Sequence, residues 1–217
     1  MNRFDFCDFE MQCETRTALG RRWLWPRLDQ HGFDYPLKYN VPDIEEHVRQ
    51  ILREKRRVAV QAGGCCGMIP WLLSLYYEKV YTFEPDPLNF YCLVNNTQGG
   101  NIFAFNAALG SFTAQVGLKH APPQNIGMHK IEGHGWIPQL YLDGFPFRYL
   151  DGLFLDAEES EESIILGGIN TISSHEPDLI MAETVSEHIR LTLEEEGFEK
   201  PTQRSKDCDW AFVRKKA

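Results

Sequence analysis

The chain has 217 residues, 43% of them hydrophobic, and a formal net charge of −9 at pH 7. This length and apolar content predict one well-packed domain over 1–217, because two domains would each be small. The negative charge disfavours a nucleic-acid partner, since binding to a phosphate backbone depends on many Lys and Arg side chains.

The apolar segments and the cysteines exclude further classes of protein. No apolar run approaches the roughly 20 residues that span a bilayer, and the acidic start MNRFDFCDFEMQCE has no signal-peptide core. We therefore expect a soluble, cytoplasmic protein without a membrane partner. The six cysteines include no C-x-x-C pair, so neither a disulfide scaffold nor a zinc site is indicated. We interpret the adjacent Cys65 and Cys66 as small apolar filler in a tight turn.

Residues 1–40 are an N-terminal extension ahead of the first clear helix. The extension carries an aromatic group that we expect to pack at the core or the domain edge: Trp23, Trp25, Phe33, Tyr35 and Tyr39. Of the residues in this extension, we expect Tyr39 and Asn40 to lie nearest to any bound ligand. The next stretch, VPDIEEHVRQILREKRR (41–57), predicts a helix that Asp43 caps and that has one apolar face. That face consists of Ile44, Val48, Ile51 and Leu52.

Short apolar runs then alternate with amphipathic helical ones. Strands are predicted at 58–62, 80–85, 102–109, 150–158 and 177–184, and helices at 68–79, 87–96, 159–172 and 186–198. Strands that are apolar on both faces and separated by helices indicate an α/β fold, with a mostly parallel central sheet and helices on both faces. Residues 112–118 are expected to extend this sheet. The tail 199–215 has a polar turn between two strand-like pieces, which predicts a C-terminal antiparallel hairpin.

One long irregular stretch, 119–136, is rich in Gly, Pro and His. Loops of this length in a compact domain are usually functional or disordered, so we treat 119–136 as a candidate active-site loop. His129 and His134 lie in it and have the titration range of a general base, although solvated loop histidines are the more ordinary interpretation.

The stretch VAVQAGGCCGMIP (58–70) joins a buried strand to a helix through a glycine-rich turn. Its spacing is not G-x-G-x-x-G, which disfavours NAD or FAD and with them an oxidoreductase. The turn does contain Gly63, Gly64 and Gly67, where the backbone can approach a ligand closely. Glu84 follows about 20 residues later at the end of the next strand, where a carboxylate can accept hydrogen bonds from ribose hydroxyls.

Several motifs follow one another along the chain: AGGCCG, then FEPDPLNFYCLVNN, NAALG, NIG and LDGLFLDAEESEESIILGGINTISSHEPDLIMAE. From about Asp43 to Glu183 this order resembles a diverged member of the FkbM-like family of S-adenosylmethionine-dependent methyltransferases. That family has D-x-G-A-N-x-G, E-P-x-P, N-x-A-L-G and K-x-D-x-E-G motifs and a closing P-x-x-x-x-E. The resemblance implies a Rossmann-like class I methyltransferase fold, with S-adenosylmethionine as cofactor and S-adenosylhomocysteine as product.

The resemblance also implies roles for particular residues. The three turn glycines would line the methionine part of the cofactor, Glu84 with Pro85 beside it would bind the ribose, and Asn106 and Ala107 would flank adenine. Asp156 and Glu158 match the carboxylates of the fourth motif, and Glu183 matches the closing glutamate. The sequence departs from the family at three positions: Gln61 stands where the first motif is acidic, Phe154 where the fourth has Lys, and Glu159 where it has Gly. We expect Gln61 to face the cofactor's ammonium with an amide dipole, and so to bind it more weakly than a carboxylate would.

Methyl transfer requires an acceptor aligned with the sulfonium and the removal of one proton. Asp156, at the carboxyl end of a central strand and also a cofactor neighbour, is the first choice for this base, and Glu158 is the second. A metal site built from Asp156, Glu183 and a loop histidine is conceivable, but no spacing demands it, and no metal is predicted. The expected function is O-methylation of a small-molecule or sugar acceptor. The alternative is a binding or regulatory protein that keeps the fold and transfers nothing.

Overall fold

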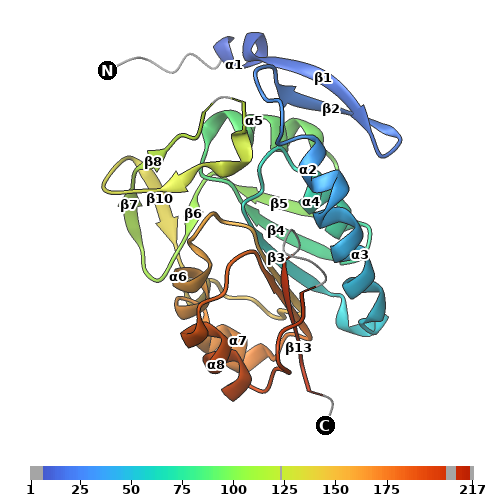
Figure 1. Ribbon diagram of the computed structural model, residues 1–217, viewed down its shortest axis with the longest axis vertical. Helices are drawn as coiled ribbons and strands as arrows, with labels where there is room; N and C mark the ends of the chain where they lie inside the picture. The colour runs from blue at the N-terminus through green and yellow to red at the C-terminus, as the bar shows by residue number, and fades with distance from the viewer. Residues whose placement is uncertain (1–6, 123, 204–208, 216–217) are drawn as a thin grey trace.

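The computed structural model describes residues 7–122, 124–203 and 209–215. Its centre is a sheet with the strand order β13-β12-β11-β3-β4-β5 (Figure 1). The strands are β3 (Val58–Ala62), β4 (Lys79–Phe83), β5 (Ile102–Phe105), β11 (Gly152–Leu155), β12 (Leu179–Ala182) and β13 (Trp210–Val213). The pairs from β12 to β5 are all parallel, and β13 is antiparallel to β12. The predicted α/β class with a mostly parallel sheet is confirmed.

Helices cover both faces of this sheet (Figure 1). One core contains side chains of α3 (Asn40–Gln50), α4 (Met68–Ser74) and α5 (Pro87–Asn96), and the other contains those of α6 (Glu161–Leu166), α7 (Ile169–His175) and α8 (Glu187–Glu195). Successive strand residues alternate between the two cores, as Ala59 and Val60 do on β3. Every residue of β3, β11 and β12 is therefore buried, which explains why these strands are apolar throughout except at Gln61 of β3.

The strand order reverses between β3 and β11. From β3 the chain moves outward through β4 to β5, and from β11 it moves outward in the opposite direction to β12. In open parallel sheets, the connections leave a crevice at such a reversal, outside the carboxyl ends of the strands. The fold therefore predicts where a ligand would bind before any side chain is considered.

The N-terminal extension packs beside α5. It contains α1 (Cys7–Gln12), a hairpin of β1 (Cys13–Ala18) and β2 (Arg21–Pro26), and α2 (Asp34–Lys38). The hairpin is fixed to α5, because the Asn96 side chain accepts the N–H of Leu24 at 2.7 Å and donates to the Leu24 carbonyl at 2.8 Å. Core packing is confirmed for Trp23, Trp25 and Phe33, but Tyr35 is 47% exposed.

Residues 108–119 and 130–140 form structure outside the central sheet. A small sheet has the order β6-β10-β7, with β6 (Ala108–Leu109), β10 (Ile137–Leu140) and β7 (Ala114–Val116). Beside it, β8 (Leu118–Lys119) pairs with β9 (Lys130–Ile131). Two predictions were therefore wrong: 102–109 is not one strand, since the chain leaves the sheet after Phe105, and 112–118 does not extend the central sheet.

Several predicted boundaries also shift. Asp43 lies inside α3 and does not cap it, and Leu52 is 64% exposed, because Ile51 is already extended (φ −76°, ψ 138°). The remaining short elements are three 3-10 turns, η1 (Arg53–Lys55), η2 (Ile126–Met128) and η3 (Leu142–Gly144). The predicted helix 159–172 breaks at Gly167, where a Cβ would lie 2.2 Å from the Gly110 carbonyl oxygen.

The C-terminal segment returns along the sheet edge. Isolated antiparallel bridges join Phe198 to Arg214 and Thr202 to Ala211, as the predicted hairpin requires, and its turn at 204–208 lies outside the described residues. Within the described part of the chain, no helix has the length and apolar composition to cross a bilayer.

Candidate functional site

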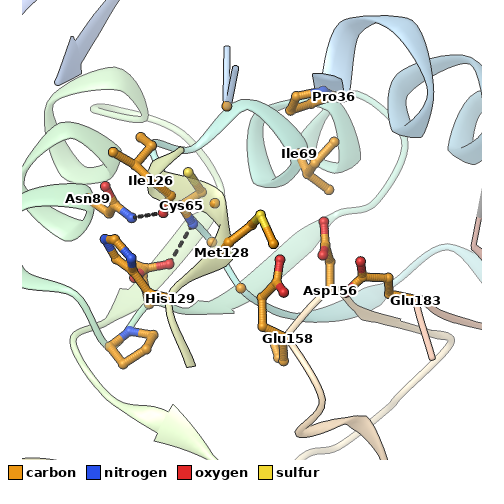
Figure 2. A pocket seen from close by; sticks show the side chains of 18 of the residues that line it. Pro36, Cys65, Ile69, Asn89, Ile126, Met128, His129, Asp156, Glu158 and Glu183 are labelled. Carbon is orange, nitrogen blue, oxygen red and sulfur yellow. Dashed lines mark hydrogen bonds between the residues drawn. The ribbon is translucent and has the colours of Figure 1, made fainter. Parts of the chain in front are cut away.

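A cavity of about 350 Å³ opens at the carboxyl ends of β3, β4, β11 and β12, where the strand order reverses. This volume lies in the range of small-molecule sites, which start near 300 Å³. Figure 2 shows that the cavity has two ends, with Met128 between them. Cys65, Asn89 and His129 lie at one end, and three carboxylates, Asp156, Glu158 and Glu183, converge at the other.

The glycine turn forms one wall of the cavity. Gly63 is in the left-handed region (φ 82°), and a Cβ there would lie 1.7 Å from the Asp156 carbonyl oxygen, so only glycine fits. Gly63, Gly64 and Cys65 all line the cavity. Gly67 does not: it precedes α4 with φ 92° and packs against Leu93 and Thr97. A glycine is therefore needed at this position so that α4 and α5 can pack closely, and Gly67 does not line the cavity.

Gln61 also lies outside the cavity lining, contrary to the expectation that its amide faces a ligand. Its Nε2 donates to the carbonyls of Ala62 (2.9 Å) and Gly63 (2.7 Å), and its Oε1 accepts from the Thr82 hydroxyl. The side chain is buried. The amide thus holds the turn through two donated hydrogen bonds, which an acidic residue at this position cannot make.

Glu84 ends β4 and lines the other end of the cavity together with Pro85. Its two carboxylate oxygens accept the backbone N–H groups of Cys65 (2.7 Å) and Asp86 (2.8 Å). Burial, followed by the nearby Asp86 charge, raises the pKa of Glu84 to about 8. Each carboxylate oxygen keeps a free lone pair, so the group can still accept a hydroxyl from a ligand.

Asn106 and Ala107 do not line the cavity. The Asn106 amide donates to the carbonyls of Glu84 (2.8 Å) and Pro85 (3.3 Å), and Ala107 is buried. Both residues therefore support the wall that Glu84 and Pro85 form. The expectation that they flank a ligand is not met by the geometry, because the chain turns away from the sheet at this point.

The acidic end of the cavity brings together side chains from β11 and β12. One oxygen from each of Asp156, Glu158 and Glu183 lies within 4.8 Å of the others. Burial, with the charges of Asp209 and Glu183 next, raises the pKa of Asp156 well above its usual range. Burial and then Glu183 raise the pKa of Glu158 to about 7, and burial and then Glu161 raise that of Glu183. Such shifts are typical of groups that exchange protons in a functional site.

The backbone that follows Asp156 is strained. Glu158 (φ 49°) and Glu159 (φ 73°) are both left-handed, a conformation that costs about 1 kcal/mol or more for a residue with a Cβ. Glu159 is the position where the resembling family has Gly, and this conformation is the physical reason for a glycine there. The Glu159 carboxylate meets Lys130 Nζ at 2.5 Å, and this ion pair fastens the 119–136 loop to the acidic end.

Phe154, where the family has Lys, is buried away from the cavity. Its ring meets that of Tyr77 edge-on at 5.9 Å in the core beneath α3 and α4. The lysine of the family motif has no counterpart on this strand. A cation comes from the 119–136 loop instead. The Lys130 charge opposes the rise in the pKa values of Glu158 and Glu183.

The 119–136 loop covers the cavity, and Asp86 anchors it. Asp86 Oδ1 caps α5 by accepting the N–H groups of Leu88 and Asn89, while Oδ2 accepts from His120 Nε2 at 3.0 Å. His129 lines the cavity, and burial lowers its pKa. His134 is exposed and does not line it, so the structure does not support His134 as a base.

Asp86, His120 and His129 also bring potential metal ligands within 4.8 Å of one another. However, His129 Nδ1 accepts the backbone N–H of Ala121 at 3.0 Å, so its proton lies on Nε2, the atom that faces Asp86 at 3.9 Å. A metal-binding histidine normally donates from its second nitrogen. The cluster is therefore a hydrogen-bonded anchor.

The N-terminal extension supplies the last wall. Trp25, Tyr35, Pro36 and Asn40 line the cavity, whereas Tyr39 does not. Asp29 organises this wall through its two carboxylate oxygens. Oδ2 accepts from Trp25 Nε1 (2.8 Å) and the Phe33 N–H (3.0 Å), and Oδ1 accepts from the N–H groups of Gly32 (3.0 Å) and Ile126 (3.3 Å). One buried carboxylate thus joins the extension to the loop.

Other residues of the site were not singled out from the sequence. Asn89 lines the cavity and donates to the Ile126 carbonyl at 3.0 Å, and Met128 and Ser160 also line it. Asn89 sits three residues after the Asp86 helix cap, which was the only local signal for it. The contacts of Met128 and Ile126 depend on how the loop folds over the sheet, which no local pattern reveals.

The chain resembles known proteins in its fold. No family model matches the chain, and no curated protein matches it. Among solved structures, it is similar to the methyltransferase FkbM from Methylobacillus flagellatus KT, with 18% identity, a TM-score of 0.50, and coverage of 73% of this chain and 44% of that one. The chain thus spans less than half of the Methylobacillus protein.

Weaker similarities involve two further methyltransferases. Magnesium protoporphyrin IX methyltransferase from Synechocystis PCC 6803, crystallised with bound SAM, is 14% identical with a TM-score of 0.46, covering 81% of this chain and 80% of that one. M. jannaschii TYW2, in complex with AdoMet, is 11% identical with a TM-score of 0.48, covering 94% and 87%. The likeness to FkbM shows that the chain has the Rossmann-like class I methyltransferase fold, as the sequence predicts.

Proposed function

We propose that the chain is an S-adenosylmethionine-dependent methyltransferase that methylates a hydroxyl of a small-molecule or sugar acceptor. The observation that carries the proposal is the two-ended cavity at the reversal of strand order. One end has a buried carboxylate, Glu84, in reach of a ribose, and the other has Asp156 and Glu158 in reach of an acceptor.

The lining suits the cofactor chemically. Glu84 offers lone pairs to vicinal hydroxyls, and its raised pKa reflects burial that a hydroxyl-bearing ligand would relieve by hydrogen bonding. Phe83, Pro85, Leu109 and Ile126 supply apolar surface to the same cavity, which an adenine ring would cover. The backbone of Gly63, Gly64 and Cys65 allows a close approach in between.

When bound, S-adenosylmethionine supplies a methyl group already activated on a sulfonium. The residues of this chain then have to position an acceptor and take one proton. Asp156 is held at the end of β11 beside the glycine turn, and its raised pKa makes its carboxylate a stronger base than an exposed aspartate. Glu158 is the second candidate, with a pKa of about 7 that lets it exchange protons near neutral pH. The loop residues Met128 and His129 line the same cavity.

A second function is favoured by Gln61, whose amide is committed to the turn where the family motif has an acidic residue. On this alternative, the chain binds the cofactor and regulates or carries it without transferring the methyl group. The positions of Phe154 and Glu159, both departures from the motif, are compatible with either function.

One experiment separates these functions. Purified protein is titrated with S-adenosylmethionine and with S-adenosylhomocysteine by calorimetry, and is then incubated with labelled cofactor and a panel of sugars and phenols. Binding of both ligands together with label transfer supports the methyltransferase. Binding without transfer to any acceptor supports the alternative, and absence of binding contradicts both.

A further inference from the structure

The lining of the cavity has an unusual balance of charge. Three carboxylates, Asp156, Glu158 and Glu183, lie at the acceptor end, Glu84 lies at the other end, and no Lys or Arg lines the cavity among the described residues. Of its two histidines, His31 and His129, burial lowers the pKa of His129 and so favours its neutral form. A ligand that entered this end would therefore meet hydrogen-bond acceptors almost everywhere.

Lys130 does not neutralise the carboxylates of Asp156, Glu158 and Glu183. Its ammonium pairs with Glu159 at 2.5 Å, and it does not line the cavity. Its charge lowers the pKa values of Glu158 and Glu183, yet both remain raised, because burial and the neighbouring carboxylates outweigh it. No Lys or Arg in the described lining therefore balances the charge that these carboxylates carry when they are ionised.

Asn40 provides an independent sign of a missing donor. It lines the same cavity, is only 6% exposed, and its Oδ1 has no hydrogen-bond partner. Its side chain hydrogen-bonds to Asp209, which leaves the amide oxygen as the unused atom. A buried acceptor without a donor is destabilising, so this oxygen favours a ligand that brings an N–H.

The spacing of the carboxylates also suits an ammonium group. One oxygen from each of Asp156, Glu158 and Glu183 lies within 4.8 Å of the others. An ammonium that makes three hydrogen bonds of about 2.8 Å in tetrahedral directions meets acceptors about 4.6 Å apart, which falls within this limit. Figure 2 shows Ile69 and Pro36 on the same side of the cavity as Asp156, so apolar surface adjoins these charges.

We infer that the acceptor carries a protonated amine next to the hydroxyl that is methylated, as an amino sugar or an amino alcohol does. The amine binds among the carboxylate oxygens of Asp156, Glu158 and Glu183, and the hydroxyl beside it lies against Asp156. This inference rests on the proposed methyltransferase function and names its substrate class.

A bound cation would also prepare the base. Burial and then the charges of Asp209 and Glu183 raise the pKa of Asp156, and a positive charge beside it would favour the ionised form that can accept a proton. A neutral acceptor would not favour the ionised form of Asp156. A neutral analogue should therefore bind more weakly and be methylated more slowly than the amine.

The test uses protein saturated with S-adenosylhomocysteine, titrated at pH 7 with glucosamine, glucose and N-acetylglucosamine as probes. Glucosamine should bind at least about tenfold more tightly than the two neutral sugars. The Glu158→Gln/Glu183→Gln double variant should lose that preference and keep its affinity for S-adenosylhomocysteine within about twofold. The control variant Glu132→Gln removes a carboxylate on the 119–136 loop whose side chain is 61% exposed. This variant should retain the preference for glucosamine.

Three results would overturn the inference. Equal binding of the three sugars would show that no cationic subsite exists, while binding of S-adenosylhomocysteine would leave the proposed function standing. A double variant that loses S-adenosylhomocysteine would assign the carboxylates to the cofactor. Binding of MgCl₂ alone that the double variant abolishes would assign them to a metal ion. Failure of wild type to bind either cofactor form would count against the proposed function itself.

Discussion

Gln61→Glu is the sharpest test of how the glycine turn is built. In the resembling family the position is acidic, so restoring a carboxyl would be expected to improve cofactor binding. The structure leads to the opposite expectation. The Gln61 amide nitrogen donates to two carbonyls, those of Ala62 and Gly63, and a carboxylate of the same length would place negative oxygen against both.

The size of the effect follows from these contacts. Two donated hydrogen bonds are lost, each contributing about 0.5 to 1.5 kcal/mol, and a buried charge with only the Thr82 hydroxyl as donor adds about 1 to 3 kcal/mol. We expect the free energy of unfolding to fall by about 2 to 6 kcal/mol at pH 7.5. The introduced carboxyl would have a folded pKa above its unfolded value of about 4.3. The part of the loss that comes from the charge is therefore small below that pH, and it grows as the pH rises until it levels off above the folded pKa.

The measurement is urea unfolding of wild type and Gln61→Glu between pH 4 and 8, with calorimetric titration of S-adenosylmethionine at pH 7.5. The variant should also bind the cofactor more weakly, because Gly63 lines the cavity. Gln50→Glu, which adds the same charge at an exposed position on α3, is the control and should change neither quantity. A Gln61→Glu protein that is as stable as wild type and binds the cofactor more tightly would refute this account of the turn.

Four further outcomes are expected. Glu84→Ala should weaken binding of S-adenosylmethionine about 10- to 100-fold in calorimetry, and unchanged affinity would remove Glu84 from the ribose site. Asp156→Asn should lower the rate of label transfer about 100-fold or more while cofactor affinity stays within about twofold; full activity would make Asp156 structural. The kcat/KM of wild type should rise with pH through about 7, as the Glu158 carboxyl ionises, and Glu158→Gln should lack this step; a step that persists belongs to another group. Glu159→Gly should raise the free energy of unfolding by about 1 kcal/mol, because it relieves a left-handed residue and loses only an exposed ion pair; destabilisation would show that Lys130 pairing outweighs the strain.

The central sheet was predictable because its signal is local. Strands such as β3 and β12 are buried on both faces, so their apolar runs stand out between amphipathic helices. The errors came where long-range contacts decide the structure. The break after Phe105 and the split at Gly167 both depend on a close approach by a distant segment, and no local pattern records it.

The candidate site divides in the same way. Gly63, Glu84 and Asp156 lie at strand ends, and strand ends of a parallel sheet meet, so their convergence on one cavity follows from the topology. Gln61 and Asn106 were expected to touch the ligand but support its walls instead, since the direction of a side chain depends on partners such as Thr82 that the motif does not include. Asn89 and Met128 line the cavity because the 119–136 loop packs over this part of the sheet.

The shared carboxylate of Asp29 has a consequence for local opening of the structure. It accepts amide hydrogens from Gly32 and Phe33 in the extension and from Ile126 in the loop, 97 residues further along the chain. Displacing this carboxylate would break all three hydrogen bonds at once, so the three amides should exchange with deuterium together when it moves. The loop and the segment around Gly32 would then open in one event, while Asn96 still holds the β1–β2 hairpin to α5.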